Sequence, residues 1–192
     1  MASTDTITNY FNNILLRDPT SAELSSYETR VAAGFTLEEV RDELIATPES
    51  QTYAQQIIRM YQAAFGRIPD AAGLDGWVDG VRDGSLTTTD LANGFIHSDE
   101  WSALYGSAVV SNTAIQTLYQ NMLDRAASTE EVDAWVATGQ DIGQILIQIA
   151  NSGEAQASCN PAVVALQQAA GDADNPADIY VGAGNLCELY MA

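Results

Sequence analysis

The chain has 192 residues and a formal net charge of −19, from seven Lys plus Arg against 26 Asp plus Glu. This acidic excess argues strongly against a nucleic-acid partner, whose phosphates need a basic face, and it disfavours an anionic membrane surface. With 46 % hydrophobic residues, the chain can bury a core of its own. We expect a globular protein whose acidic coat suits a salty medium and admits cations or a cationic partner.

The N-terminal stretch, residues 1–9, has neither a basic segment nor an apolar one, so we expect no cleaved N-terminal signal. No apolar run approaches the roughly 20 residues that a membrane span requires. We therefore expect a soluble protein without membrane insertion. If it is exported, it leaves by a route that needs no cleaved signal.

Three stretches of the chain share one pattern, which is the clearest feature of the sequence. Each has an arginine, an aromatic residue six positions earlier and another aromatic residue ten positions later. The three sets are Phe11, Arg17 and Tyr27, then Tyr61, Arg67 and Trp77, then Tyr119, Arg125 and Trp135. Each unit closes on a hydroxyl residue and an acid, namely Thr47 and Glu49, Ser98 and Glu100, and Ser152 and Glu154. A period of about 50 residues predicts stacked helical units that bury one another's apolar faces.

The second unit shows how a unit is built. Apolar residues recur at helical spacing over residues 51–65. Thr47 and Pro48 are typical of the start of this helix, and Gly66 is typical of its end. The later helices of the unit are predicted to begin at Asp70, at Thr88 or Thr89, and at Ser98.

The predicted fold is all-α, with about ten short helices in three tandem repeats followed by a C-terminal helical extension. The repeats are expected at residues 1–50, 51–105 and 112–158, and the extension at residues 159–192. The second helix of the third repeat is shorter by about one turn, so this repeat is expected to be a degraded, capping unit. The extension is predicted to contain a helix from Asn160 and Pro161 to Ala170, an acidic linker and a short final helix.

From Tyr61 to Trp77 the second unit carries the pattern Y-x3-F-G-R-x-P-D-x2-G-L-x2-W. This pattern resembles a domain-of-unknown-function family found in bacterial secreted, S-layer and repeats-in-toxin proteins. The first unit departs from it, with Leu16 in place of the glycine, and so does the third, with Asp124 there. The resemblance implies an extracellular or surface-associated helical module, often with calcium nearby and exported by a one-step secretion system. It implies no known enzyme activity.

The helical domain of phycobilisome linker polypeptides shows a more distant similarity, because it also carries a helix rich in Tyr and Phe. That resemblance implies an intracellular linker that organises a larger complex. The chain contains no nine-residue calcium-binding repeat.

The repeated arginines, Arg17, Arg67 and Arg125, stand at predicted helix ends. A guanidinium there can satisfy the last carbonyls of the helix or bind a carboxylate in bidentate fashion. The repeated acids Glu49, Glu100 and Glu154 are the candidate partners. A structural role is favoured, and ligand binding is the alternative.

The aromatic residues invite two interpretations. Tyr27, Trp77 and Trp135 recur among apolar neighbours, so they are expected to be core anchors rather than sugar-stacking residues. Trp101 has no aromatic counterpart in the other units, so it is a better candidate for an exposed contact residue than these three, although burial is favoured for it as well.

Asp75, Asp79 and Asp83 lie four apart, on one predicted helix face. A solvated acidic face is favoured over a divalent cation site, because a straight stripe converges poorly on an ion such as Ca²⁺. We assign no metal ligand and expect no cofactor, with a bound Ca²⁺ as the alternative. Cys159 and Cys187 either form one disulfide that pins the last segment or remain buried thiols.

The sequence offers no catalytic constellation. His97 is the only histidine, and it is expected to complete hydrogen bonds at a helix end rather than to act as a general base. No G-x-S-x-G nucleophile motif is present. We therefore expect a protein that is not an enzyme.

The expected function is that of a structural or interaction module in an extracellular or surface assembly, such as an S-layer, a surface appendage or a virion. The expected partners are further copies of itself, other surface proteins or a surface glycan. One alternative is a small secreted protein that binds calcium or carbohydrate. The other is the intracellular linker that the distant resemblance implies.

Overall fold

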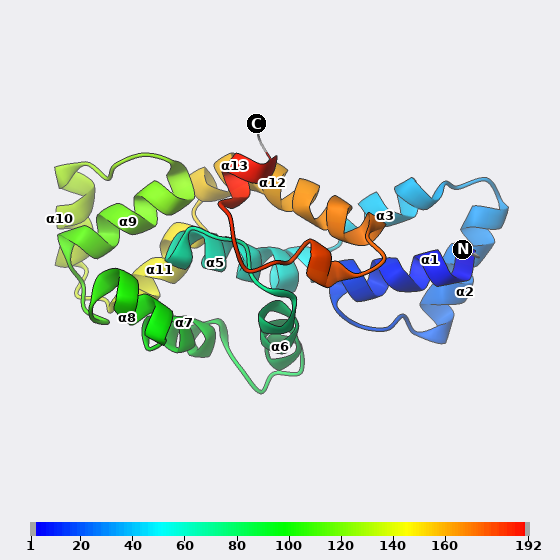
Figure 1. The fold of residues 1–192 in the computed structure, drawn as a ribbon, viewed down its shortest axis with the longest axis horizontal. Helices are drawn as coiled ribbons and strands as arrows, with labels where there is room; N and C mark the ends of the chain where they lie inside the picture. The colour runs from blue at the N-terminus through cyan, green and yellow to red at the C-terminus, as the bar shows by residue number, and fades with distance from the viewer. Residues whose placement is uncertain (1–2, 191–192) are drawn as a thin grey trace.

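The computed structural model describes residues 3–190, apart from the side chain of Cys187. Within these residues the fold is all-α, and the only extended pairing is an isolated antiparallel bridge between Asp70 and Val181. Figure 1 shows an elongated molecule, with the first unit at one end and the third unit at the other. The predicted all-α fold of tandem helical repeats is confirmed.

The helices fall into three units and an extension, and α4 lies before the predicted boundary between residues 50 and 51 although it continues into η2 and α5. The first unit consists of α1 (Ser3–Tyr10), the π-helical turn η1 (Phe11–Leu15), α2 (Ser21–Ala32) and α3 (Leu37–Ala46). The second consists of α4 (Pro48–Ser50), the π-helical turn η2 (Gln51–Gln55), α5 (Gln56–Phe65), α6 (Ala71–Arg82), α7 (Thr88–Ile96) and α8 (Asp99–Tyr105). The third consists of α9 (Asn112–Leu123), α10 (Thr129–Ala137) and α11 (Ile142–Ala150). The extension contains α12 (Gly153–Asp172), the 3-10 turn η3 (Pro176–Asp178) and α13 (Leu186–Tyr190).

Most of the helices start at a side chain that accepts a hydrogen bond from the backbone N–H three residues later. These N-caps are Thr20, Thr36, Thr47, Asp70, Thr87, Ser98, Ser111, Ser128, Asp141 and Ser152. Each such cap stabilises its helix by about 1 kcal/mol. The N-cap of α7 is Thr87, and not Thr88 or Thr89 as predicted, because Thr87 and Asp90 cap each other reciprocally.

The second helix of the third unit is shorter, as predicted, with nine residues in α10 against 12 in α6. The prediction for the extension is wrong in one respect. Helix α12 begins after Ser152 and runs through Pro161, so it has 20 residues and crosses the predicted boundary at residues 158 and 159. Side chains on both sides of the proline are buried, namely Ala155, Cys159, Ala162, Val163 and Leu166. Their burial offsets the roughly 3 kcal/mol that a proline costs inside a helix.

The residue before each repeated arginine has a left-handed backbone, with φ of 57° at Leu16, 64° at Gly66 and 50° at Asp124. Each of these residues ends the helical segment that opens its unit, which is α1 with η1, then α4 with η2 and α5, then α9. Glycine adopts this conformation freely, whereas for other residues it costs roughly 1–2 kcal/mol of conformational free energy. The three units therefore share one turn geometry, although only the second has the residue best suited to it.

The buried apolar residues form two clusters. The smaller cluster belongs to the first unit, with Ile7, Phe11 and Leu44 among its members. The larger cluster joins the second and third units to the extension. Helix α12 contacts η1 and α3 as well as α5 and α9, so it connects the two clusters along one edge of the molecule (Figure 1).

The segment after α12, residues 173–186, which we call the C-terminal strap, crosses the turn at residues 67–70. The backbone N–H groups of Ile68 and Ala71 donate to the carbonyls of Gly184 (3.1 Å) and Tyr180 (3.0 Å). The N–H of Gly182 donates to the carbonyl of Pro69 at 3.2 Å. Tyr180 is buried, so the strap is fixed to the turn that carries the repeated motif. Within residues 3–190, no helix is both long and apolar enough to cross a membrane.

We predict that Asp124→Gly raises the free energy of unfolding by about 1 kcal/mol, because it relieves a left-handed residue and removes an acid from a helix C-terminus. The melting temperature should rise by about 2–4 °C in a calorimetric scan. Gly66→Ala is the matched control. It should destabilise the protein, since φ is 64° there and the added Cβ would lie 3.0 Å from Asn121 Oδ1. Destabilisation by Asp124→Gly would contradict the shared turn geometry.

Candidate functional site

Each repeated arginine lies over the ring of the aromatic residue six positions earlier. The guanidinium carbon lies 5.2 Å from the ring centre for Arg17 over Phe11, 5.2 Å for Arg67 over Tyr61 and 5.0 Å for Arg125 over Tyr119. Such cation–π contacts hold the charged group flat against the end of the first helix of the unit. The left-handed residue before each arginine turns the chain so that this contact can form.

The first arginine binds two carboxylates. Arg17 donates from Nε and Nη2 to the two oxygens of Glu49, at 2.7 and 2.8 Å. It also donates from Nη1 and Nη2 to the two oxygens of Glu23, at 3.0 and 2.7 Å. Glu23 lies in the first turn of α2, and Glu49 in the first turn of α4. We call an arginine with its carboxylates an arginine clamp, since it joins the ends of three helices.

The third unit repeats this geometry. Arg125 binds Glu154 at 2.7 and 2.9 Å, and it binds Glu131 at 2.8 and 3.0 Å. Both carboxylates again lie in first turns, those of α12 and α10. Acids at helix N-termini are favourable in themselves, so each clamp also stabilises the helices that it joins.

The second unit has a reduced clamp. Arg67 binds Glu100 in bidentate fashion, with both distances at 2.7 Å. Gly73 stands six residues after the arginine, where the other units have an acid, and its N–H instead donates to the Asp70 cap at 2.8 Å. Arg67 also lies 5.5 Å from the ring centre of Phe65. Glu49, Glu100 and Glu154, the acids suggested by the repeat pattern, are therefore the residues that the three guanidiniums bind.

The clamps shift the acidity of their carboxylates. Hydrogen bonds from Arg17 lower the pKa of Glu23 to about 2, and hydrogen bonds from Arg125 lower the pKa of Glu131 to about 2. The pKa of Glu154 is lowered for the same reason, and the pKa of Arg67 is raised by its bonds to Glu100. These carboxylates stay ionised over most of the pH range, which suits a structural role better than proton transfer.

The repeated aromatic residues flank the core rather than lie inside it. Tyr27, Trp77 and Trp135 are half-buried. Trp77 packs edge-on against Phe95, with ring centres 5.9 Å apart. The Trp135 Nε1–H donates to the hydroxyl of Tyr119 at 2.9 Å, so this residue braces the ring beneath the third clamp. The prediction of core anchors therefore overstated their burial.

Trp101, the predicted contact residue, is buried, with 0 % of its surface exposed. Its ring stacks on Tyr105 at 4.1 Å, and its Nε1–H donates to the carbonyl of Ser107 at 3.1 Å. The loop between α8 and α9 folds back over the indole and covers it. The suggestion of an exposed contact residue is wrong for this reason.

The acidic stripe on α6 does not converge on a point. Asp79 accepts a hydrogen bond from Arg82 at 3.0 Å, and Asp83 accepts one from the N–H of Ser85 at 2.8 Å. Burial raises the pKa of Asp75, with the Asp79 charge adding to the effect. Among the described residues, no group of three or more His, Cys, Asp or Glu side chains is placed to hold a metal ion.

His97 lies at the C-terminal end of α7, where its Nδ1 is 2.8 Å from the carbonyl of Asn93. This is the helix-end role expected from the sequence. Cys159 is buried in α12. The side chain of Cys187 lies outside the described residues, so the disulfide between these cysteines stays a prediction.

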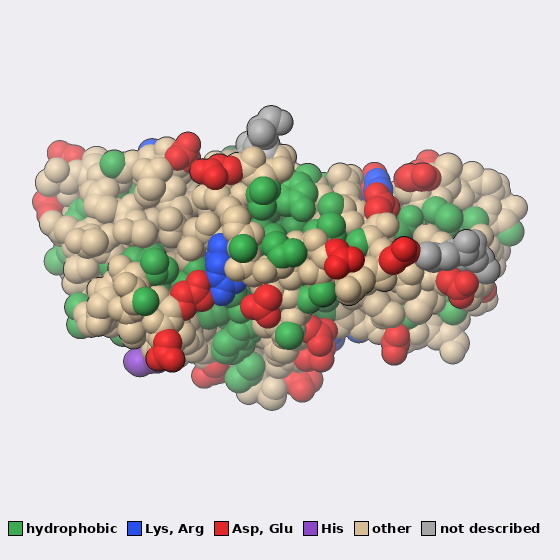
Figure 2. All heavy atoms as spheres, in the orientation of Figure 1, with side chains coloured by type: hydrophobic (Ala, Val, Ile, Leu, Met, Phe, Trp, Pro, Cys, Tyr) green, Lys and Arg blue, Asp and Glu red, His purple; other side chains and the backbone are tan. Residues whose placement is uncertain are grey.

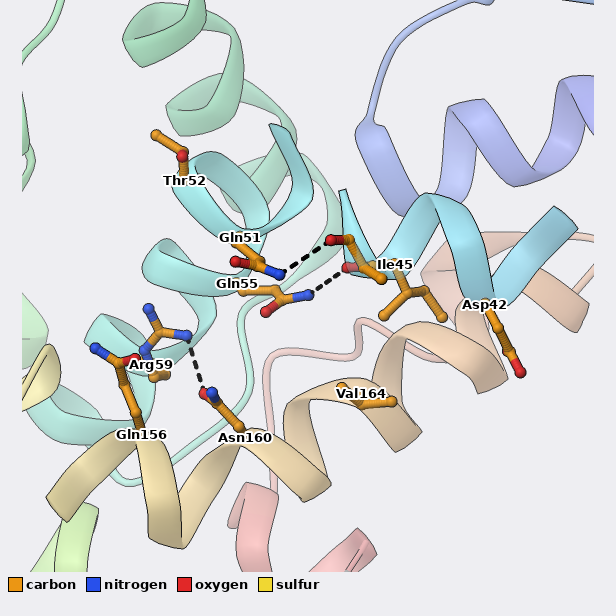
Figure 3. Close-up of a pocket in the computed structure, with 10 residues that line it drawn as sticks. Asp42, Ile45, Gln51, Thr52, Gln55, Arg59, Gln156, Asn160 and Val164 are labelled. Carbon is orange, nitrogen blue, oxygen red and sulfur yellow. Dashed lines mark hydrogen bonds between the residues drawn. The ribbon is translucent and has the colours of Figure 1, made fainter. Parts of the chain in front are cut away.

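A pocket of about 480 Å³ opens where α3, η2, α5 and α12 meet (Figure 3). Its lining residues are Asp42, Ile45, Ala46, Gln51, Thr52, Gln55, Arg59, Gln156, Asn160 and Val164. This volume falls in the range of about 300–1,000 Å³ that is usual for small-molecule sites. Side-chain amides and one guanidinium supply most of the polar groups on its walls.

Arg59 stands at the inner end of this pocket and is only 6 % exposed. Its Nη1 donates to Asn160 Oδ1 at 3.2 Å and its Nη2 to Asn151 Oδ1 at 3.3 Å. The Nε–H has no hydrogen-bond acceptor among the described residues. Burial lowers the pKa of Arg59, an effect that the nearby Cys159 partly opposes.

A buried polar network positions the pocket wall. Gln55, which is 4 % exposed, donates from Nε2 to the carbonyl of Ile45 at 2.8 Å and to Gln167 Oε1 at 2.9 Å. Gln167 in turn donates from Nε2 to the Ser50 hydroxyl at 2.9 Å. These bonds lock η2 to α3 and α12, so the wall is fixed before any ligand arrives.

Two features of the site were not predicted from the sequence. Glu23 and Glu131 both stand six residues after a repeated arginine, a spacing that could have identified them as clamp residues. Arg59 interrupts an apolar run in the predicted helix, which is a signal for a buried charge. Its neighbours Asn151 and Asn160 are more than 90 residues away in the chain, so the pocket itself gives no local signal.

Comparison with known proteins gives one match. The family model described as Domain of unknown function (DUF4214) matches residues 42–105 and again residues 92–159. Each matched segment contains one clamp, the reduced clamp of Arg67 with Glu100 in the first and the clamp of Arg125 with Glu131 and Glu154 in the second. No curated protein and no solved structure matches the chain.

We predict that Arg67→Ala lowers the free energy of unfolding by about 2 kcal/mol, because Glu100 loses a bidentate partner and two rings lose their cation. The melting temperature should fall by about 4–8 °C. Arg125→Ala is the comparison variant. Its side chain is 36 % exposed against 20 % for Arg67, so a smaller loss is expected. An unchanged melting temperature for Arg67→Ala would contradict a structural clamp.

A further prediction concerns the loss of stability at acidic pH. The folded-state pKa of Glu23 is about 2, against an ordinary value of 4.5, so its contribution to stability is present above pH 4.5 and is lost as the pH falls toward 2. Because the side chain is 33 % exposed, we expect this contribution to be about 1 kcal/mol after screening. Denaturant titrations of Glu23→Gln between these pH values should show a shallower acid loss than the wild type. Glu130→Gln, which removes one exposed charge from α10, should match the wild type, and equal slopes for all three proteins would contradict the prediction.

Proposed function

We propose that this chain, which belongs to the DUF4214 family of domains of unknown function, is a non-enzymatic interaction module of an extracellular or surface assembly. Its proposed neighbours are further copies of the same chain. The motif residues of the family match take part in internal clamps and caps, so they build the scaffold. The interaction itself is assigned to another part of the surface.

One observation carries this proposal, an apolar patch on the C-terminal strap and α13. Val181 is 53 % exposed and Leu189 is 54 % exposed. Tyr180 and Leu186 of the same segment are buried, so the segment has an inner apolar face that fixes it and an outer apolar face. Figure 2 shows hydrophobic side chains gathered over the middle of this face of the molecule. Exposed apolar patches of this kind often mark association surfaces.

The charge of the chain determines how such association should behave. Two copies of a chain with net charge −19 repel each other at low ionic strength. Salt shortens the screening length from about 10 Å at 0.1 M to about 3 Å at 1 M, whereas apolar contact does not weaken with it. The proposed extracellular location rests on the same acidic surface, which favours solubility in a salty medium.

We predict that the mean mass in sedimentation equilibrium or multi-angle light scattering rises with protein concentration, and rises further with added salt. Val181→Asp combined with Leu189→Asp should keep the protein monomeric, because charges then replace the apolar patch. Val136→Asp on α10 is the control, since Val136 is equally exposed at 52 % but lies outside the patch. A wild-type protein that stays monomeric at high salt, or a control that dissociates as readily, would overturn the proposal.

A further inference from the structure

Arg59 is an exception among the arginines of the chain. The other six each have a carboxylate oxygen within 4.0 Å of a guanidinium nitrogen. No carboxylate of the described residues lies within that distance of Arg59, although the chain has 26 acidic residues. Its hydrogen-bond acceptors among the described residues are two amide oxygens, which carry no charge.

A buried cation without a counter-charge is costly, because it loses its hydration and gains no ion pair in return. Arginine stays protonated near neutral pH, so Arg59 keeps its charge despite the burial. The neighbouring Cys159 lies in the interior, where neither a neutral thiol nor a disulfide would supply a full charge. The missing counter-charge and the pocket that Arg59 lines together indicate a place for an external anion.

We propose that this pocket binds a small hydroxylated monocarboxylate of the size of a hexuronic acid, with its carboxylate on Arg59. One guanidinium matches one carboxylate, because the two planar groups form charge-assisted hydrogen bonds with each other. A dianionic phosphate would bring a second charge that no other cation lining the pocket compensates. This inference stands independently of the proposed self-association.

The rest of the pocket suits the hydroxyl groups of such a ligand. Gln51 and Gln156 donate from Nε2 to the backbone carbonyls of Ala46 and Asn151, both at 3.0 Å. Each amide therefore keeps its oxygen as an acceptor for a ligand hydroxyl. Thr52 also lines the pocket, although Figure 3 shows its side chain directed away from the other labelled residues.

Two aliphatic side chains complete the pocket. Ile45 and Val164 give it an apolar wall, against which the C–H face of a sugar ring can pack. Asp42 lies at the edge, where its carboxylate accepts a hydrogen bond from Arg41 at 3.0 Å. Its charge is thus partly neutralised before a ligand approaches.

Titration calorimetry with D-glucuronate tests the proposal. For about a dozen non-hydrogen atoms at ordinary ligand efficiency, the dissociation constant is expected on the order of 0.1–1 mM. The methyl ester of glucuronate, which has the same shape without the charge, and D-glucose should bind at least about tenfold more weakly. Glucose 6-phosphate should also bind more weakly. Absence of glucuronate binding, or equal binding of the ester, would overturn the proposal.

Variants locate the binding. Arg59→Met removes the buried charge but keeps the volume, so the melting temperature should stay the same or rise while affinity for glucuronate falls about 10- to 100-fold. Arg30→Met, which removes an arginine paired with Glu43 outside the pocket, should leave the affinity unchanged. Gln156→Ala at the exposed rim keeps the test decisive if Arg59→Met fails to fold, because it should weaken binding without affecting the core. Wild-type affinity in either Arg59→Met or Gln156→Ala would assign the binding elsewhere and refute the pocket.

Discussion

The arginine clamp is the interaction on which the arrangement of each unit depends. A left-handed residue ends the first helix, the next residue places its guanidinium over an aromatic ring of that helix, and the carboxylates come from the first turns of later helices. The clamp therefore fixes three helix ends at one point. Since both carboxylates in the first and third units lie at helix N-termini, each contact is favoured by the helix dipole as well as by the ion pair. Half-burial protects these pairs from the full screening that makes surface ion pairs weak.

Because the arginines are engaged in these contacts, few cations remain to offset the acidic residues of the surface. Six of the seven arginines are engaged with carboxylates, and most of the 26 acidic residues have no cationic partner within the described part of the chain. The outer surface is consequently acidic, and Figure 2 shows red side chains distributed along the whole face. Any partner must either bring cations or rely on apolar contact. Arg59 is the one guanidinium left in a position to meet an anion that does not belong to the described chain.

Much of this arrangement could be predicted from the sequence, because its signals are local or repeated. The pairs of Arg17 with Glu49 and of Arg67 with Glu100 recur at nearly constant spacing, which made them predictable. The replacements at Leu16 and Asp124 indicated a glycine position, but not that both residues would accept left-handed strain to keep the clamp.

Where local and distant effects disagree, sequence reasoning failed. Pro161 locally predicts a helix start, yet burial on both sides carries α12 through it. Trp101 has no repeated counterpart, and its burial depends on how a loop folds back over it. Arg59 could be recognised as unusual within an apolar run, whereas its amide neighbours lie far along the chain, Asn151 at the end of α11 and Asn160 in α12.

The residue three positions after Thr47, Ser98 and Ser152 differs between the units, and the difference helps to form the pocket that Arg59 lines. Ser50, Trp101 and Ala155 occupy this position, and all three are buried. In the second unit the indole of Trp101 fills the space between helices. After the first unit the small Ser50 leaves room for Gln167 of α12, and their hydrogen bonds hold the wall that contains Gln55. The pocket thus depends on α12 extending past Pro161 to reach the first unit. A helix ending before that proline would keep Gln156 and Asn160 beside Arg59, but it would lose Val164 from the pocket wall and Gln167 from the network that fixes Gln55.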